Sequence, residues 1–192
     1  MNLRATKKQE SRQKILDAAA QRIRTEGMQG AGIATVMDDA GLTHGAFYSH
    51  FKNKDELARV ALAAALDGNR QRWAGNSVTQ PWPKRLAELA KRYLTQAHRD
   101  NLSHSCALAA LCSDAGRSDE AFKQAYETEL IKSLNAIVGC DFETLNEKQS
   151  EEALAFVALI IGSITLSRAV SSKTLSDQLL NAGTITATRI AE

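Results

Sequence analysis

Hydrophobic residues recur at helical spacing along most of the chain, beginning near its N-terminus. Ile15, Ala19 and Ile23 lie four residues apart, which places them on one face of a helix. Ser11 is the expected N-cap of this helix and Gly27 is its expected stop. The residues before Ser11 are expected to form an unstructured basic arm. The pattern therefore predicts a first helix with one buried stripe and a basic surface.

Two short helices are predicted to follow. The first covers residues 33–40, and Gly41 then provides the backbone freedom that a tight turn requires. Thr43 is placed to cap the next helix, in which Phe47 and Phe51 are four residues apart and share a face. These two rings are expected to anchor that helix to its neighbours. The opposite face is small and polar, so it is suited to enter a groove in a partner.

The rest of the chain also has helical patterns, so the predicted fold class is all-α. Asn53 and Glu56 form a capping box for a helix that runs to about Trp73. The clearest break covers residues 75–83 and contains both prolines. Further helices, with their capping and stop residues, are predicted at 83–99, 105–115 (cap Ser105, stop Gly116), 118–138 (cap Ser118, stop Gly139), 147–171 (cap Asn146) and 175–190 (cap Thr174).

Charge and composition narrow the possible functions. The net charge is only +2, but residues 1–24 carry seven basic side chains against two acidic ones, which favours a negatively charged partner. Three cysteines without paired spacing argue against a disulfide framework and a zinc finger. No set of nucleophile, base and orienting group indicates an enzyme, and no cofactor is predicted. The apolar run at residues 154–166 is too short to cross a membrane, and no signal peptide precedes the basic start, so a cytoplasmic protein is expected.

Two short helices joined by a tight glycine turn form a helix-turn-helix motif when the second presents an outward polar face. Any small helical bundle can contain such a corner, so spacing alone does not distinguish DNA binding from plain packing. The outward side chains favour DNA because they can hydrogen-bond phosphate oxygens or base edges. They are Thr43, His44, Tyr48, Ser49, His50, Lys52 and Lys54, and Gly45 would let the backbone approach the duplex.

One run of residues in the N-terminal third of the chain has the pattern of a known family. It reads Val36-Met37, followed by Ala40-Gly41-Leu42-Thr43-His44-Gly45-Ala46-Phe47-Tyr48-Ser49-His50-Phe51-Lys52-Asn53-Lys54-Asp55-Glu56-Leu57. The region of roughly residues 11–60 resembles the DNA-binding head of TetR-type transcriptional regulators. The remaining two thirds resembles that family only in the number and length of its helices. The resemblance implies a homodimer that places one recognition helix, about residues 44–50, in each of two successive major grooves of a pseudo-palindromic DNA operator.

The resemblance also implies roles for individual residues. Tyr48 and Lys54 would contact phosphates, and the residues along the bases or their flanking phosphates would be Thr43, His44, Gly45, Ala46, Ser49 and His50. Many relatives have threonine at the start of the second helix, where this chain has Ala31-Gly32. A backbone amide or Thr35 would take over that contact. The basic arm would either attract phosphates without regard to sequence or be merely solvated; its residues are Lys7, Lys8 and Arg12.

The predicted domains are an N-terminal arm and helix-turn-helix DNA-binding domain at residues 1–52 and a helical effector-binding and dimerisation domain at residues 53–192. The helices at about 147–171 and 175–190 are expected to form an intersubunit four-helix bundle, because the first is apolar around much of its circumference. The alternative is a central helix of a monomer. The resemblance implies a small, largely apolar effector of unknown identity. Candidate pocket residues, which also fit a plain core, are Tyr93, Phe122, Tyr126 and Phe156.

The resulting hypothesis is a transcriptional repressor that a small molecule releases from its operator. One alternative is a redox or electrophile sensor that acts through Cys106, since a cysteine in the first turn of a helix is favoured as the reactive thiolate. Cys106 also fits an ordinary half-buried cysteine. His44 and His50 are six residues apart, which does not suit a shared metal ion, so no metal site is predicted. A helical interaction module that does not bind DNA is the remaining alternative.

Overall fold

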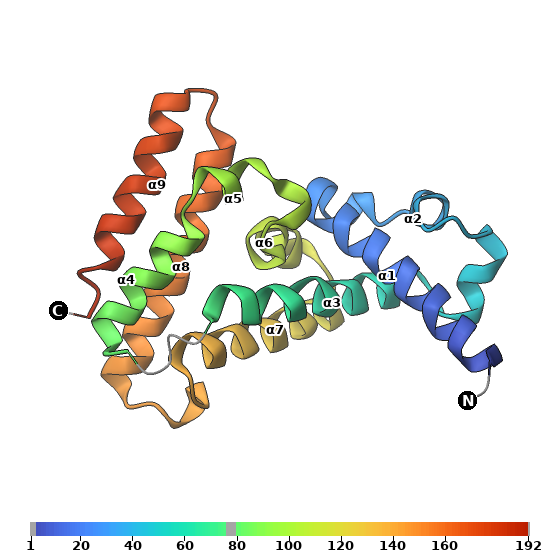
Figure 1. Cartoon of the computed structure of the whole chain (residues 1–192), viewed down its shortest axis with the longest axis horizontal. Coiled ribbons are helices and arrows are strands. Elements are labelled where there is room, and N and C mark those ends of the chain that lie inside the picture. The colour runs from blue at the N-terminus through green and yellow to red at the C-terminus, as the bar shows by residue number, and fades with distance from the viewer. Residues whose placement is uncertain (1–2, 76–79, 192) are drawn as a thin grey trace. The chain divides into compact units, whose positions relative to one another are not determined.

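The computed structural model describes residues 3–75 and 80–191, and within these ranges the protein consists of helices without a strand (Figure 1). The predicted all-α fold class is confirmed. The break predicted at residues 75–83 lies partly outside the described residues. The last helix before it ends at Ala74, and the first helix after it begins at Trp82.

The helices follow the predicted order, and several boundaries are shifted. In chain order they are α1 (Leu3–Gly30), α2 (Ile33–Asp39), η1 (His44–Ser49), α3 (Lys54–Ala74), α4 (Trp82–Tyr93), α5 (Gln96–Asp100), η3 (Leu102–His104), α6 (Ala107–Arg117), α7 (Glu120–Val138), η4 (Phe142–Thr144), α8 (Glu147–Ala169) and α9 (Lys173–Ala187), where η denotes a 3-10 helix. The helix predicted at 83–99 is in fact two helices. Thr95 lies between them and caps α5, because its hydroxyl accepts a hydrogen bond from the His98 amide at 3.0 Å.

The chain forms two compact units. The first comprises Met1–Asp67 and Cys106–Glu127, and the second comprises Gly68–Ser105 and Thr128–Glu192. Helices α3 and α7 therefore contribute residues to both units. Helix α6 belongs wholly to the first unit, together with α1, α2 and η1. The functional division expected after residue 52 stays a prediction.

The first helix, α1, begins earlier than predicted. Residues 3–10 are helical instead of forming an unstructured arm, because lysine, glutamine and glutamate favour helices. Ser11 is not an N-cap, since its Oγ donates a hydrogen bond to the Lys7 carbonyl within the helix, at 2.9 Å. The predicted stop is confirmed, because Gly27 interrupts α1 with a φ of 68°, a left-handed conformation that favours glycine.

The core of the first unit is formed by the buried faces of α1, α2 and η1. Ile15 and Ile23 of α1 are fully buried, as are Val36 of α2 and Phe47 of η1. Full burial of each such side chain contributes about 1.5–3 kcal/mol of hydrophobic stabilisation. Helix α1 packs against both α2 and α6, and α2 packs against η1. The predicted inward stripe on α1 is therefore confirmed.

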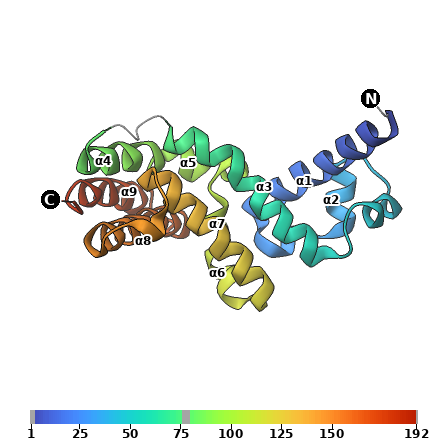
Figure 2. The same ribbon diagram turned by 90° about the horizontal axis from the view of Figure 1, so that it is seen from below.

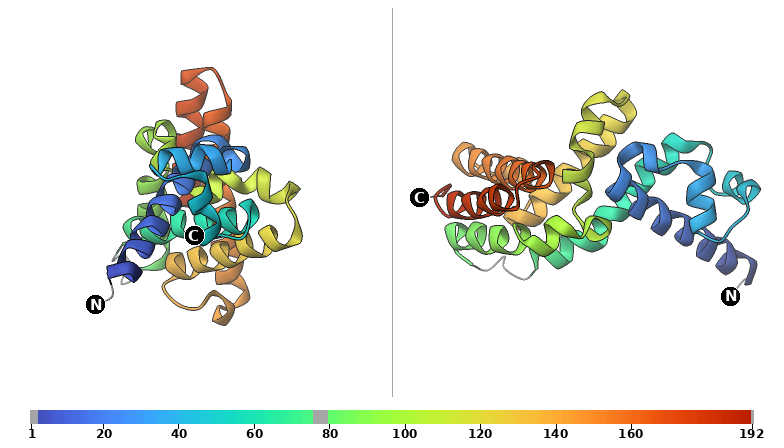
Figure 3. Two further views of the ribbon diagram at one scale, coloured as in Figure 1. Left: turned by 90° about the vertical axis from the view of Figure 1, so that its right-hand side faces the viewer. Right: turned by 90° about the horizontal axis from the view of Figure 1, so that it is seen from above.

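The second unit is organised around α8 and α9, and α4 packs against both (Figures 2 and 3). Phe156, Ile160 and Ile164 form the buried side of α8, and Leu180 lies on the buried side of α9. The two helices approach closely at Gly183 of α9, where an added Cβ would lie 2.3 Å from the Oγ of Ser163. Only glycine fits at this crossing without displacing its neighbours.

Arg85 of α4 is almost fully buried and stabilises the C-terminal end of α7 within the second unit. Its Nη2 donates to the carbonyl of Ala136 at 2.7 Å, and its Nε donates to the carbonyl of Ile137. These carbonyls lie in the last turn of α7, which lacks donors from its own helix and carries the negative end of the helix dipole. Burial lowers the pKa of the guanidinium, and the nearby Arg92 lowers it further.

Several predicted helix ends are wrong by one or two residues. The observed N-caps, with the predicted ones in parentheses, are Cys106 (Ser105) for α6, Asp119 (Ser118) for α7 and Ser172 (Thr174) for α9. At each site, two or three neighbouring polar residues are able to cap the helix. The sequence does not distinguish them, because the choice depends on the backbone conformation at that point. The cap Asn146 and the stop Gly139, with a φ of 81°, are confirmed. Helix α6 continues past the predicted stop Gly116 to Arg117.

Of the described helices, α8 alone is long and apolar enough to cross a membrane by length and composition. Length therefore does not exclude a membrane span, contrary to the sequence-based expectation, because the helix extends beyond its apolar run at both ends. In the second unit, however, α8 buries one face against α9 and α4. Polar Ser163 and Ser167 lie on that buried face, and the Ser167 carbonyl accepts a hydrogen bond from Ser176 of α9 at 2.6 Å. This is the pattern of a core helix with a second, exposed apolar side.

Candidate DNA-binding site

The turn between α2 and η1 is tight, as predicted. The amide of Gly41 donates to the carbonyl of Asp38, and the amide of Leu42 donates to the carbonyl of Met37, both at 2.9 Å. Gly41 has a φ of 66°, in the left-handed region that glycine adopts without strain. The turn therefore redirects the chain within a few residues and brings η1 against α2, which together form a helix-turn-helix.

The recognition helix is a 3-10 helix, η1, and not the α-helix that was predicted. It covers His44–Ser49, and Thr43 precedes it without making a side-chain cap. Such tight helices occur in short pieces, and this one is only six residues long. Ser49 supports the i, i+3 spacing because its Oγ donates to the carbonyl of Ala46 at 2.7 Å. That bond uses the only proton of the Ser49 hydroxyl, so Ser49 meets a partner chiefly as an acceptor.

Two aromatic residues anchor η1, as predicted. Phe47 is fully buried and Phe51 nearly so, and their ring centroids lie 5.7 Å apart. Tyr48 points outward and is 61% exposed, with its ring edge-on to Phe47 at 5.2 Å and to His44 at 6.1 Å. The neighbouring positions predicted to meet DNA are also exposed, namely Thr43, His44, Gly45, Ser49 and Lys52, while Ala46, His50 and Lys54 are half-buried.

The start of α2 offers backbone amides in place of the threonine that many TetR-type relatives carry. Ala31 is fully buried, so it offers no side chain to DNA. Gly32 is the N-cap of α2 and makes no side-chain hydrogen bond. The amides of the first turn are therefore left for another acceptor, and Thr35 lies exposed beside them. A phosphate contact by a backbone amide or by Thr35 stays a prediction.

The helix that follows the recognition segment starts with the predicted capping box. The amide of Glu56 donates to the Oδ1 of Asn53 at 2.8 Å, and the Glu56 carboxylate accepts from the amide of Lys52 at 2.6 Å. This pair fixes the exit from η1, so that Lys52 and Lys54 are held at a defined position beside it. Both lysines lie next to the positive end of the α3 dipole, which favours an anionic partner.

An ion pair that the sequence did not reveal joins α1 to α2. Arg22 donates to both carboxylate oxygens of Asp39, at 2.6 and 3.1 Å, and also binds Glu26 at 2.7 Å. Hydrogen bonding to Arg22 holds the pKa of Asp39 below its usual value. These residues line a polar groove of about 770 Å³ together with Lys14, Asp17, Ala18, Gln21, Thr25 and Ala40. Because Arg22 and Asp39 are 17 residues apart, no local pattern predicts their contact.

A second unpredicted contact joins α6 to α1 within the first unit. The Oδ2 of Asp114 accepts a hydrogen bond from the Met28 amide at 3.0 Å, directly after the break at Gly27. An added Cβ at Gly27 would lie 2.5 Å from this same oxygen. Asp114 therefore requires glycine at the break and holds the end of α1 to α6.

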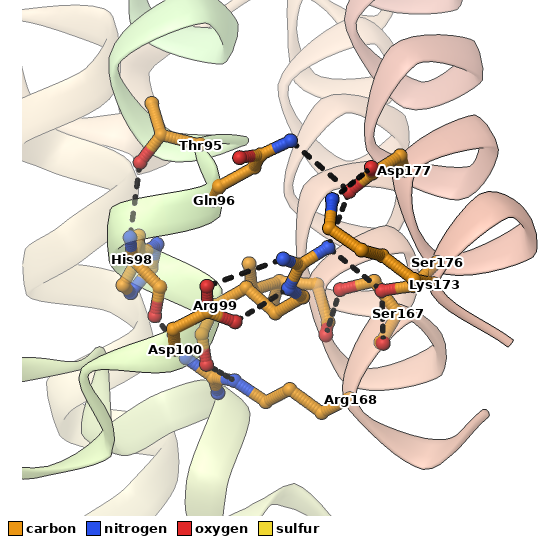
Figure 4. Close-up of polar contacts among 11 residues, drawn as sticks. Thr95, Gln96, His98, Arg99, Asp100, Ser167, Arg168, Lys173, Ser176 and Asp177 are labelled. Carbon is orange, nitrogen blue, oxygen red and sulfur yellow. Dashed lines mark hydrogen bonds and ion pairs between the residues drawn. The ribbon is translucent and has the colours of Figure 1, made fainter. Parts of the chain in front are cut away.

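The second unit holds a polar cluster where α5 meets α8 and α9 (Figure 4). Arg99 of α5 binds Asp177 and Ser176 of α9 at 2.6 and 2.9 Å, and its own neighbour Asp100 at 2.7 Å. Arg168 of α8 donates to the carbonyls of His98 and Arg99, at 2.7 and 3.2 Å. A cavity of about 330 Å³ lies beside these contacts, lined by Arg99, Asp100, Leu102, Ser167, Arg168, Val170, Ser171, Lys173 and Ser176.

The four residues nominated for an effector pocket fall in different units. Tyr93 and Phe156 are buried in the second unit, where the ring of Tyr93 contacts Trp73 and His98 with centroids 5.2 and 4.4 Å away. Phe122 and Tyr126 belong to the first unit, and the Tyr126 hydroxyl donates to the Leu108 carbonyl at 2.8 Å. None of the four lines the 330 Å³ cavity, whose lining residues are mostly charged or hydroxyl-bearing. Their role in binding an effector stays a prediction.

The cysteines are free thiols in different surroundings. Cys106 is half-buried at the N-cap of α6, one position before the first turn in which it was expected, while Cys112 and Cys140 are exposed. Cys106 lies near enough to Arg24 of α1 for their charges to interact. Across the described ranges, no three His, Cys, Asp or Glu side chains are grouped so that they could hold a metal ion.

Together, the buried anchors, the tight turn and the exposed polar face define a helix-turn-helix DNA-binding domain. Comparison with known proteins shows which family of regulators this domain is similar to. Residues 15–61 match the model for bacterial regulatory proteins of the tetR family. An uncharacterised HTH-type transcriptional regulator in the lacX 3' region of Lactococcus lactis subsp. lactis is 27% identical over 179 residues, or 86% of this chain and 84% of that protein. The HTH-type transcriptional regulator SrpR of Pseudomonas putida is 37% identical over 60 residues, or 31% of this chain and 28% of SrpR.

The fold is shared with solved structures. The crystal structure of the reduced form of Escherichia coli NemR matches 94% of this chain and 96% of that one, with a TM-score of 0.73 and 17% identity. At this identity the likeness shows the fold alone. Residues 15–61 therefore match the DNA-binding domain of the tetR family, and the chain as a whole is similar to HTH-type transcriptional regulators.

Proposed function

We propose that the protein is a homodimeric repressor that binds a pseudo-palindromic operator through η1 and leaves it when a small molecule binds the helical domain. The observation that carries the proposal is the division of η1 into two sides. Phe47 and Phe51 are buried, whereas Tyr48 is 61% exposed although burial of its ring would be favourable. An exposed aromatic residue among exposed hydrogen-bonding groups is suited to a polar partner. Such a regulator would act in the cytoplasm, without a catalytic site or a cofactor.

Within this proposal, the residues of the head divide by chemistry. Tyr48, Lys52 and Lys54 would bind phosphates, as would Thr35 with the free amides of α2. His44 is the exposed side chain best able to reach base edges, because Gly45 and Ala46 are too small. With so little direct contact available, the sequence-dependent shape of the duplex would supply part of the specificity.

Exposed apolar residues on α8 and α9 support the homodimer. On α8 the exposed positions Leu154, Ala158 and Thr165 are four and seven residues apart, which places them on one face, and Leu166 beside them is 55% exposed. On α9, Leu175 and Ile185 are each 45% exposed. Because α8 and α9 pack side by side, we infer that these positions contribute to one apolar surface. A second copy of the surface would cover it in a four-helix bundle.

Release by an effector requires a path from the helical domain to the head. Residues 95–105 run directly into α6 along the chain, and Asp114 holds α6 to α1. Arg99 and Arg168 fix α5 against α8 and α9 (Figure 4). We propose that an effector favours a different position of this segment and, through α6, a separation of the two heads that no longer matches successive major grooves, about 34–36 Å apart.

Binding to duplex DNA at increasing salt tests the proposal. The purified full chain is titrated against a fluorescent duplex of mixed sequence, and the anisotropy is measured at several salt concentrations. We expect the logarithm of the affinity to fall linearly with the logarithm of the salt concentration, with a slope of about −0.9 for each phosphate contact. Lack of binding at low salt would contradict the proposal and favour a helical interaction module.

A second candidate function is sensing of oxidants or electrophiles through Cys106. The observation that favours it is the proximity of Arg24, a residue of α1, to Cys106 at the start of α6. Modification at this junction would act on the helix that Asp114 joins to the head. We expect alkylation of the wild-type protein, but not of Cys106→Ser, to weaken DNA binding. Equal effects on the two proteins would exclude this function.

A further inference from the structure

A group of basic side chains lies where η1 meets the first turns of α1. His50 follows η1 directly, and its backbone amide donates to the carbonyl of Phe47 at 2.9 Å. The charged groups that act on its imidazole are Lys8 and Arg12, which are four residues apart and therefore share a face of α1. The Arg12 guanidinium lies 5.0 Å from the centroid of the Phe51 ring, and that ring lies 6.5 Å from the imidazole of His50. Two elements thus bring three basic groups together.

This cluster lacks the carboxylate that balances other basic groups of the head. Arg22, on the same helix, binds Asp39 and Glu26. In contrast, neither Lys8 nor Arg12 forms an ion pair with a described residue, and no described acidic group is among those that shift the titration of His50. Like charges placed this close repel one another, and the repulsion is relieved when an anion binds between them.

The imidazole itself has an unfilled hydrogen-bonding position. The Nδ1 of His50 is buried from solvent and has no hydrogen-bond partner among the described residues. A buried polar atom without a partner costs about 1–3 kcal/mol, so such an atom calls for a missing partner. Burial, followed by the charges of Lys8 and Arg12, also lowers the pKa of His50, so the protonated ring is disfavoured in the free protein.

We propose that Lys8, Arg12 and His50 together bind one phosphate of the DNA backbone, and that His50 takes up a proton from solvent when this phosphate binds. The proposal rests on the proposed function, because it assigns one contact of the same DNA-binding surface. The phosphate is the fitting partner because it is an anion whose oxygens accept hydrogen bonds from all three groups. His50 then carries a second N–H, so both ring nitrogens become donors, and no covalent bond changes other than the added N–H.

The sign of the resulting pH dependence follows from the two states of His50. In the free protein its pKa lies below the usual 6.5. The bound phosphate replaces repulsion by attraction, so the pKa rises in the complex. Between the two values the complex holds one more proton than the free protein, and affinity increases as the pH falls, by at most about tenfold per pH unit for one proton. Above both values the affinity does not depend on this group.

Duplex binding by the full chain at pH 5.5 to 8.5, at constant ionic strength, tests the proposal. The matched variants are His50→Asn and His104→Asn, since His104 is an exposed histidine at the end of η3 (Leu102–His104), outside the DNA-binding site. We expect the wild type and His104→Asn to bind more tightly as the pH falls, and His50→Asn to lose most of this dependence. Proton uptake is measured by calorimetry in two buffers of different ionisation enthalpy. A fraction of one proton is expected for the wild type and for His104→Asn, and none for His50→Asn.

Two results would overturn the proposal while the proposed function stands. One is DNA binding by the wild type without proton uptake at any pH in the range. The other is a pH dependence that is as large in His50→Asn as in the wild type and in His104→Asn. A direct measurement that needs no variant is the NMR titration of the His50 ring, whose midpoint should be higher with DNA than without. Absence of duplex binding at every pH and salt concentration would instead overturn the proposed function as well.

Discussion

Replacement of Gly183 by alanine tests how closely α8 and α9 pack in the second unit. The added Cβ would lie 2.3 Å from the Oγ of Ser163, and 2.8 Å from both the Cβ of Ser163 and the Cδ1 of Leu94. Optimal contacts between carbon atoms are about 3.5–4.0 Å, so these neighbours must move by roughly 1 Å. Rotation of the Ser163 side chain would relieve only the contact with Oγ, and the two contacts with carbon would remain.

The expected size of the effect follows from two opposing contributions. Overpacking of a core typically costs about 1–3 kcal/mol, and contacts with two different elements place this site near the upper limit. Alanine is favoured over glycine in a helix by roughly 0.5–1 kcal/mol, which offsets part of that cost. The net loss of unfolding free energy should be about 2 kcal/mol, or a decrease in Tm of roughly 4–8 °C for a chain of this size.

Thermal unfolding at a fixed protein concentration measures this effect. The control is Gly116→Ala on α6, where an added Cβ meets no atom within 4 Å, and this variant should be as stable as the wild type or slightly more so. Ser163→Gly removes two of the three close contacts, so it should recover part of the stability lost in Gly183→Ala. If Gly183→Ala is as stable as Gly116→Ala, or if Ser163→Gly gives no recovery, the close approach of the two helices is not as described.

Three further outcomes are expected. Leu166→Glu places a charge on the exposed apolar side of α8 and should convert the proposed dimer to a monomer in sedimentation experiments, whereas Lys148→Glu, on an exposed position of the same helix, should not. Tyr48→Phe and Lys54→Ala should weaken binding to all duplexes alike, whereas His44→Ala should change the preferred sequence. His98 has a pKa lowered chiefly by burial, so the unfolded chain binds its proton first, and stability should fall as the pH decreases below about 6.5. His98→Gln should flatten this acid-induced loss in denaturant titrations, and an unchanged slope would show that other groups cause it.

The sequence predicted the head well because its determining signals are local. The turn at Gly41, the anchors Phe47 and Phe51 and the capping box at Asn53 each depend on residues within a few positions of one another, and the structure confirms all of them. The type of the recognition helix was missed, because i, i+3 and i, i+4 hydrogen bonding differ little over a segment as short as His44–Ser49.

Contacts between distant segments could not be predicted in the same way. Arg22 with Asp39, Asp114 with Met28 and Arg99 with Asp177 join residues 17 to 86 positions apart, and no spacing rule relates them. The nominated pocket residues were chosen for their aromatic character alone, which is shared by pocket and core. The structure then placed Phe122 and Tyr126 in one unit and Tyr93 and Phe156 in the other. Aromatic residues in the sequence therefore do not locate an effector site unless the three-dimensional positions of their helices are known.

Selection of bound duplexes from random DNA by the purified protein tests the central claim most directly. Two heads related by twofold symmetry should recover two inverted half-sites with centres one helical turn apart, about 10–10.5 base pairs. In a selection with His44→Ala, both half-sites should change at the same symmetric positions. Recovery of a single half-site, of direct repeats or of no common sequence would contradict a homodimeric regulator that reads its operator through η1.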